Sequence, residues 1–273
     1  VFPNAGSTPD ELMTNADIAL YKSKAEGKDC INYFTDTLNQ KAKRLRFIKN
    51  NIVTCAKNGE FYMKYQPIID AKKGKTIAVE ALARWESSLG LIPPDEFISI
   101  AESSGHIHEI GRFVFDTAIA ELTEICSTLS NVNMERNIRL SVNVSVIQLL
   151  NDEFLPLLRD VSASVSTKQL SLMVEITESL FIEDVDKAKL ILENIHDAGV
   201  EVSLDDFGTG YSSLSHLSKL PISEIKIDRS FVRDILTDGQ DWLLIQSIIS
   251  LGRNMGIPVL AEGVESDQQV TKL

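Results

Sequence analysis

Acidic and amide side chains stand at the ends of short apolar runs in this sequence, and their chemistry is that of ligands for hard metal ions. From residue 77 onward, five of six such runs carry an acid or an amide, and the sixth carries a lysine. The residues are Glu80, Asn143, Glu175, Asp205, Asp206, Lys226 and Glu262. A buried charge is costly unless it is paired or bound to a metal. One such residue would indicate a structural salt bridge, whereas the whole set indicates a metal site.

The ligand type predicts which metal this site would take. Carboxylate and amide oxygens suit Mg²⁺ or Mn²⁺, whereas zinc favours thiolate and imidazole ligands. None of the four histidines, His106, His108, His196 and His216, stands at the end of an apolar run. Five carboxylates are more than one ion needs, so we expect two ions, which would clamp the attacking and leaving oxygens of a phosphoryl displacement. Lys226 would hold the attacking water or screen phosphate charge.

Alternating strands and helices must position these residues. The apolar runs of strand length are 61–68, 77–83, 138–144, 170–176, 200–205, 223–227 and 257–262. Amphipathic stretches at 107–129, 184–198 and 240–255 separate most of them. This alternation predicts an α/β fold with a largely parallel sheet of seven strands, one short of a closed (β/α)8 barrel. The ends of parallel strands converge on one mouth, where we expect the carboxylates to meet.

The first 58 residues show a different pattern of predicted elements. Residues 8–27 predict a helix that Gly27 ends, residues 30–34 predict a short strand, and residues 36–58 predict a helical connector rich in Lys and Arg. About 35 residues are too few to form a core alone, so we expect them to be the end of a larger preceding domain. The basic run at 41–46 predicts a solvated helix face more readily than a nucleic-acid contact.

Composition limits the partners and the compartment. The 273 residues include 27 Lys plus Arg and 39 Asp plus Glu, a net charge of −12, which argues against binding a nucleic-acid polymer or an anionic membrane. Three widely spaced cysteines predict neither a disulfide framework nor a cysteine zinc site and favour the cytoplasm. No apolar stretch is long enough to span a membrane, although upstream segments could anchor the full-length protein.

Eight short motifs between residue 60 and the end of the chain resemble a known family. They are Tyr65–Ile68, Glu80–Trp85, Pro93–Ile98, Ser141–Ser145, Glu175–Ser179, Asp205–Ser213, Lys226–Asp228 and Ala261–Glu265. Taken together they resemble the EAL domain, the bacterial phosphodiesterase family that hydrolyses cyclic di-GMP. The Asp206-Phe207-Gly208 triplet alone suggests a kinase, but no glycine-rich ATP loop or His-Arg-Asp motif accompanies it.

The resemblance implies a two-metal site of Mg²⁺ or Mn²⁺. The implied ligands of the first ion are Glu80, Asn143, Glu175 and Asp205. Asp205 and Asp206 would serve the second ion, and Glu262 would complete the shell of metal and water. In this assignment the catalytic residues are Glu80, Asp206, Lys226 and Glu262.

The resemblance also implies roles outside the metal shell. Lys226 would position the hydrolytic water, while Gln66 and Arg84 would contact the dinucleotide. Glu178 would tether the loop at 207–213, whose conformation affects metal binding and the contacts of a homodimer.

The implied fold is a TIM-like (β/α)8 barrel of the EAL type that lacks its last βα unit. We assign residues 59–273 to this domain, 36–58 to a helical linker, and 1–35 to the end of a GGDEF domain of the diguanylate cyclase family. The last assignment depends on Ala16–Asp29, because the Gly-Gly-Asp-Glu-Phe signature is absent and no cyclase activity follows.

The sequence departs from the EAL pattern in two places. The turn at Glu86–Gly90 lacks the His-Pro pair common there, which bears on substrate fit. The family continues through an eighth strand, near which a glutamine contributes to the site, so we expect the natural protein to extend beyond Leu273.

Three functions are compatible with these residues. The first is hydrolysis of cyclic di-GMP to linear pGpG, and the retained metal and water residues favour it. The second is a catalytically silent receptor for cyclic di-GMP, although such receptors usually lose part of the metal set. The third is hydrolysis of a different phosphodiester, against which the Gln66 and Arg84 motifs weigh.

Overall fold

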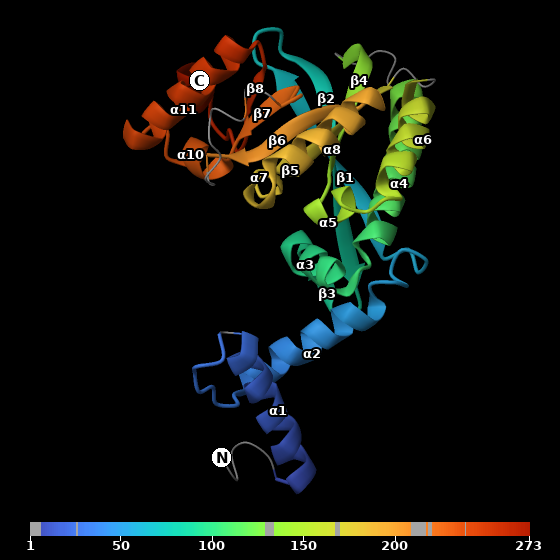
Figure 1. Ribbon diagram of the computed structural model, residues 1–273, viewed down its shortest axis with the longest axis vertical. Helices are drawn as coiled ribbons and strands as arrows, with labels where there is room; N and C mark the ends of the chain where they lie inside the picture. The colour runs from blue at the N-terminus through green and yellow to red at the C-terminus, as the bar shows by residue number, and fades with distance from the viewer. Residues whose placement is uncertain are drawn as a thin grey trace.

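The computed structural model describes residues 7–25, 27–128, 134–166, 170–208, 217, 220–237 and 239–273. One curled sheet runs through the described part in the order β1-β2-β4-β5-β6-β7-β8, with β3 added beside β2 (Figure 1). The strands are β1 Phe61–Asp70, β2 Lys75–Ser87, β3 Gly90–Ile92, β4 Met134–Asn143, β5 Leu170–Thr177, β6 Glu201–Phe207, β7 Glu224–Ile227 and β8 Val259–Ala261. All seven predicted strands form, and the fold class is confirmed as an incomplete TIM-like α/β barrel.

The orientation of the first strand refines the prediction of a largely parallel sheet. The five pairings from β2–β4 to β7–β8 are parallel, as predicted. β1, however, lies antiparallel to β2. Residues 71–74 alone connect these two strands, and a connection this short cannot make the crossover that a parallel pair needs. The antiparallel hairpin places Gln66 directly opposite Glu80.

Helices cover the outside of the curled sheet. Figure 1 shows α4 and α6 along one side of it, and α10 and α11 beside the last strands. The helices are α1 Pro9–Ala25, α2 Asp36–Asn51, α3 Pro94–Ser104, α4 Ile107–Thr128, α5 Val146–Leu149, α6 Phe154–Ser166, α7 Leu180–Glu183, α8 Val185–Asp197, α10 Arg229–Arg233, α11 Gly239–Met255 and α12 Asp267–Lys272. None of the described helices has the length and apolarity that crossing a membrane requires.

The apolar core lies between the sheet and these helices. Alternation along the strands sends Val142, Val174 and Leu204 outward into this layer, where each is fully buried. The residues between them face the inside of the curl, which is where the polar side chains of the sequence patterns stand. The fold therefore separates an apolar outer layer from a polar interior that opens at the carboxyl ends of the parallel strands.

The N-terminal elements differ from the sequence prediction in two details. The strand expected over residues 30–34 is wrong: within the described residues this segment joins no sheet, and the backbone N–H of Asn32 donates to Ser23 Oγ at 3.2 Å. The helix expected over 36–58 ends at Asn51, and turns follow. Asn51 Nδ2 donates to the Phe47 carbonyl at 2.7 Å in the last turn, and the Ile52 N–H donates to the Ile48 carbonyl, one of the groups that the helix end leaves free.

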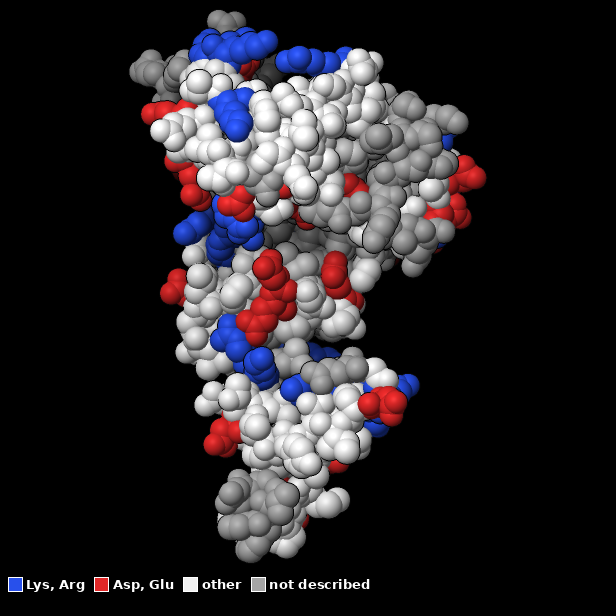
Figure 2. Space-filling model, turned by 90° about the vertical axis from the view of Figure 1, so that its left-hand side faces the viewer, with Lys and Arg blue, Asp and Glu red and all other residues white. Residues whose placement is uncertain are grey.

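Helix α2 extends away from the barrel and is attached to it at one end (Figure 1). Ile48 and Ile52 are buried in the core, and Arg44 Nε donates to Glu96 Oε1 on α3 at 2.7 Å. Lys41 and Lys43 are exposed, in agreement with a solvated face for the basic run. On the molecular face in Figure 2, basic side chains stand in small groups among acidic ones and form no continuous patch.

Candidate metal and phosphodiester site

Lys226 lies at the centre of the predicted site. It is the third residue of the buried strand β7, and its side chain is 1% exposed. Four carboxylates surround its ammonium nitrogen. The distances from Lys226 Nζ are 2.6 Å to Glu175 Oε2, 2.6 Å to Glu262 Oε1, 3.3 Å to Asp205 Oδ1 and 3.7 Å to Glu80 Oε2. The structure therefore brings together acids from β2, β5, β6 and the segment after β8, as the convergence of parallel strands predicts.

Asn143 joins the same cluster. It ends β4 directly opposite Glu175 in the parallel ladder, and its Nδ2 donates to Glu80 Oε1 at 2.7 Å. Its side-chain oxygen is the atom of an amide that binds a hard cation. Asn143 is exposed while Glu175 is buried, so the cluster extends from the barrel interior to solvent.

Asp205 and Asp206 adopt an irregular backbone. Adjacent residues of a regular strand point to opposite faces, but the register between β6 and β7 shifts between Leu204 and Phe207. Asp206 has a φ of +54°, which L-residues other than Asn and Asp rarely adopt, and its N–H donates to Asp205 Oδ1 at 2.9 Å. Such irregularities redirect side chains next to active sites. This one keeps both carboxylates near Lys226.

The pKa values show how the cluster balances its charges. Burial raises the pKa of Glu175 above that of an ordinary glutamate, even though Lys226 acts in the opposite direction. Burial, with the charges of Asp205 and Asp228, raises the pKa of Asp206 to about 6. Burial opposes the charge on Lys226, but the surrounding carboxylates outweigh it and raise the pKa of the ammonium. One fixed positive charge is thus shared among more acids than it can neutralise.

The donor set fits a divalent cation better than it fits the lysine alone. Glu175 Oε1 is buried and has no hydrogen-bond partner in the described part of the chain. A buried carboxylate oxygen needs a partner, and a cation supplies one. Among the described residues, no group of three or more His, Cys, Asp or Glu side chains is already arranged around one metal position. The acids instead surround the Lys226 ammonium.

The remaining predicted residues lie around this cluster. Glu80 and Arg84 share one face of β2 because they are four positions apart, and Arg84 Nη1 donates to the Ala83 carbonyl at 2.8 Å. Gln66 is exposed on β1, opposite Glu80. Glu178 Oε1 accepts a hydrogen bond from the Gly208 N–H at 2.8 Å, at the start of the predicted loop. Residues 209–213, with the dimer contact predicted there, lie outside the described residues.

Asp228, for which the sequence patterns predict no role, lies beside the site in the structure. Its side chain hydrogen-bonds to that of Asp206 and also accepts from the Ser230 N–H at 2.9 Å, so that it caps α10. The signal in the sequence was an Asp two positions after Lys226 and at the start of a helix, the position where capping acids occur.

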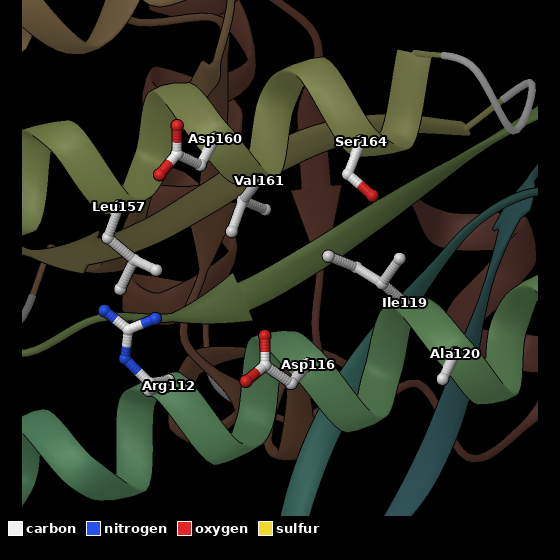
Figure 3. A pocket seen from close by; sticks show the side chains of 8 residues that line it. All are labelled: Arg112, Asp116, Ile119, Ala120, Leu157, Asp160, Val161 and Ser164. Atoms are coloured by element: carbon white, nitrogen blue, oxygen red, sulfur yellow. The ribbon is translucent and has the colours of Figure 1, made fainter.

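A separate hollow of about 260 Å³ lies between α4 and α6 (Figure 3). Arg112, Asp116 and Leu157 are among its lining residues, and the side chains project from two facing helices. None of the lining residues is a predicted site residue, because the hollow belongs to the outer helical layer and the site belongs to the strand ends.

Comparisons with known proteins place the chain among related sequences and structures. A model of the EAL domain matches residues 49–273. The chain is 36% identical over 270 residues to the bifunctional diguanylate cyclase/cyclic di-GMP phosphodiesterase MucR of Pseudomonas aeruginosa, covering 98% of this chain and 39% of that protein. It is 35% identical over 268 residues to the cyclic di-GMP phosphodiesterase PdeR of Escherichia coli, covering 98% and 40%.

A solved structure of the PaMucR phosphodiesterase in complex with c-di-GMP is also similar. The identity is 34% and the TM-score 0.73, over 83% of this chain and 90% of that one. The chain spans between 31% and 40% of the length of the curated relatives it matches.

Proposed function

Because the chain belongs to the EAL domain family, we propose that it hydrolyses cyclic di-GMP to linear pGpG with the help of divalent metal ions. The observation that carries this proposal is the cluster of four carboxylates around Lys226, beside Asn143, at the mouth of the barrel. Relatives named as cyclic di-GMP phosphodiesterases support the choice of substrate.

The carboxylate and amide oxygens of this cluster have the chemistry that binds divalent metal ions. We assign Glu80, Asn143, Glu175 and Asp205 to a first ion of Mg²⁺ or Mn²⁺, Asp205 and Asp206 to a second, and Glu262 to the shell of metal and water. The ions, when bound, would lower the pKa of a water molecule and withdraw charge from the phosphoryl oxygens. Glu175 Oε1, which lacks a partner among the described residues, supports this assignment.

Lys226 acts as a charged hydrogen-bond donor in this proposal. Its raised pKa keeps the ammonium protonated at neutral pH, so it cannot serve as a general base. Its N–H groups would orient the attacking water. Water attacks phosphorus, one P–O3′ bond breaks, the water oxygen remains on phosphorus as part of the 5′-phosphate of pGpG, and the 3′-oxygen takes up a proton.

The substrate contacts come from the hairpin of β1 and β2. Arg84 shares a strand face with Glu80, and Gln66 stands opposite Glu80 on the neighbouring strand. A planar guanidinium binds phosphate oxygens with two parallel hydrogen bonds, so Arg84 would hold the anionic dinucleotide beside the metal site. The proposed substrate contacts thus come from β1 and β2, whereas the acids Glu175 and Asp205 come from β5 and β6.

Turnover of cyclic di-GMP in Mn²⁺, with pGpG measured by chromatography, tests the proposal. We expect wild-type turnover and its loss in Glu80→Ala, whereas Glu193→Ala, which removes a half-exposed acid on α8, leaves the rate unchanged. Folded, metal-loaded wild-type protein that binds cyclic di-GMP in Ca²⁺ but produces no pGpG in Mn²⁺ would show a receptor instead. Turnover of other phosphodiesters alone would show a different substrate.

Three finer assignments belong to the same proposal. Residues 1–35 would be the end of a GGDEF domain; the match to MucR, which covers 98% of this chain, supports this. A homodimer would form through the 207–213 loop, and light scattering that gives a monomer mass with substrate bound would contradict it. The free Cys30, Cys55 and Cys126 support a location in the reducing cytoplasm.

A further inference from the structure

A buried carboxylate below the site ties three strands together. Glu224 on β7 is 3% exposed, and its Oε1 accepts a hydrogen bond from Ser203 Oγ on β6 at 3.1 Å. Its Oε2 forms an ion pair with Arg139 on β4, whose side chain is 16% exposed. One side chain thus connects β4, β6 and β7 inside the barrel.

Each of these strands carries a residue of the proposed site farther along the same face. Side chains alternate along a strand, so Glu224 and Lys226 share the inner face of β7, and Ser203 and Asp205 share that of β6. Arg139 shares the inner face of β4 with Asn143, four positions farther on. The link below the site therefore joins the strands that deliver a lysine, an acid and an amide to it.

Folding stability does not explain why Arg139 and Glu224 form an ion pair here. The interiors of such barrels are usually filled by branched apolar side chains. A buried ion pair is often no more stabilising than apolar residues of the same size, because both charges lose their hydration. Arg139 Nε also has no hydrogen-bond partner among the described residues. Folding stability therefore does not account for the choice of these polar residues over apolar ones.

The register of β6 and β7 shows where that use lies. Ser203 pairs with Glu224 and Leu204 with Ile225, and the ladder becomes irregular immediately afterwards, at Asp205 and Asp206. The Ser203–Glu224 hydrogen bond thus holds the last regular stretch before the irregularity. A register slip of one residue would turn the following side chains to the opposite face.

We propose that Glu224 is a positioning residue for the hydrolysis proposed above, on which this inference rests. Through Ser203 and Arg139 it fixes the relative positions of β4, β6 and β7, and so the places of Asn143, Asp205 and Lys226. Gln66 and Arg84 lie on β1 and β2, which this link does not reach. Loss of the link should therefore lower kcat and metal affinity while KM for cyclic di-GMP changes little.

The test separates positioning from folding stability. The double variant Arg139→Met/Glu224→Leu replaces the ion pair by apolar side chains of similar size, so its urea midpoint should stay near that of wild type. We expect kcat to fall at least tenfold. We also expect Mn²⁺ to bind about tenfold more weakly, as measured by electron paramagnetic resonance without substrate. Losses of this size are typical of residues that orient metal ligands. Glu224→Gln keeps one oxygen acceptor for Arg139, and its amide N–H can donate to Ser203 Oγ, so this variant should recover part of both kcat and Mn²⁺ affinity.

Further variants keep the inference testable if the double variant is unfolded. Ser203→Ala removes one hydrogen bond and should change kcat and Mn²⁺ affinity in the same direction by a few-fold, whereas Ser247→Ala, which removes a helix-surface hydroxyl on α11, should change neither. The inference is overturned if the folded double variant has the kcat and Mn²⁺ affinity of wild type. If only Ser203→Ala is folded, the same result in that variant overturns it. If wild type does not turn over cyclic di-GMP, the proposed function fails, and Mn²⁺ affinity still decides the role of Glu224.

Discussion

Removal of the central lysine tests the electrostatic account of the site. In Lys226→Met the side chain keeps its length and loses its charge, in a position that is 1% exposed. Two carboxylates at 2.6 Å then lose their cation, and Glu175 among them is fully buried. Breaking a buried ion pair by removing one partner costs about 3–5 kcal/mol. For a domain of this size that corresponds to a fall in Tm of roughly 6–20 °C.

The metal ion should reverse part of this loss. Mn²⁺ would give the same carboxylates two positive charges, and a ligand at 100 times its Kd stabilises the folded state by about 2.7 kcal/mol. We therefore expect Mn²⁺ to stabilise Lys226→Met more than wild type, in which the ammonium competes for the same oxygens. Urea unfolding in chelator and in Mn²⁺, followed by the fluorescence of the buried Trp85, measures both effects.

A surface lysine provides the matched control. Lys189 on α8 is 45% exposed and lies 3.6 Å from Glu193, which is 50% exposed. Exposed pairs of this kind contribute about 0–1 kcal/mol, so Lys189→Met should unfold near the wild-type midpoint with and without metal. Equal stability of Lys226→Met and wild type in chelator would refute the reasoning, because it would mean that the acids do not depend on the ammonium.

Other parts of the molecule give independent predictions. Arg84→Met should raise KM for cyclic di-GMP roughly ten- to a hundredfold with a smaller change in kcat, as loss of a charged hydrogen bond predicts; steady-state kinetics measures this. Metal-free protein should become more stable to urea as pH falls through about 6, since the pKa of Asp206 is raised from 3.8 and the folded state binds that proton first. The pKa of Glu262 is also raised, so Asp206→Asn should weaken this dependence between pH 6 and 4 without abolishing it. Phe97→Ala removes a fully buried ring that contacts Phe61 and Trp85, and should lower the free energy of unfolding by about 3–5 kcal/mol in urea titrations.

The strand pattern predicted the site because side chains alternate along every strand and the ends of parallel strands converge on one mouth. Glu80 and Glu175 are far apart in sequence, yet both interrupt apolar runs, and parallel strands bring such positions to one mouth. The orientation of β1 depends instead on the short connection at 71–74, because the apolar runs alone carry no information on strand direction. The strand expected at 30–34 needed a partner strand, and apolar composition cannot show whether one is present.

The details of the site depended on interactions that no local pattern encodes. Asp205 and Asp206 are adjacent, so a regular strand would direct them to opposite faces; the irregular register and the positive φ of Asp206 bring both near Lys226. The partner of Glu224 is Arg139, three strands away around the sheet. A sequence shows that a charge is present in a buried strand, but only the curl of the sheet determines which charge meets it.

The two polar layers of the barrel have different effects on metal and substrate. Apolar side chains tolerate small shifts between strands, because dispersion contacts have little direction, whereas hydrogen bonds weaken steeply with misalignment. In the proposed site Asn143 and Asp205 would hold the same ion and Lys226 would orient the attacking water, and this arrangement needs the directional contacts that Glu224 makes one layer below. In the proposal the dinucleotide would instead be held by side chains of the β1–β2 hairpin, whose strands are fixed by their own antiparallel ladder. Substitutions in the lower layer should therefore weaken metal binding before they weaken substrate binding, and substitutions in the hairpin should do the reverse.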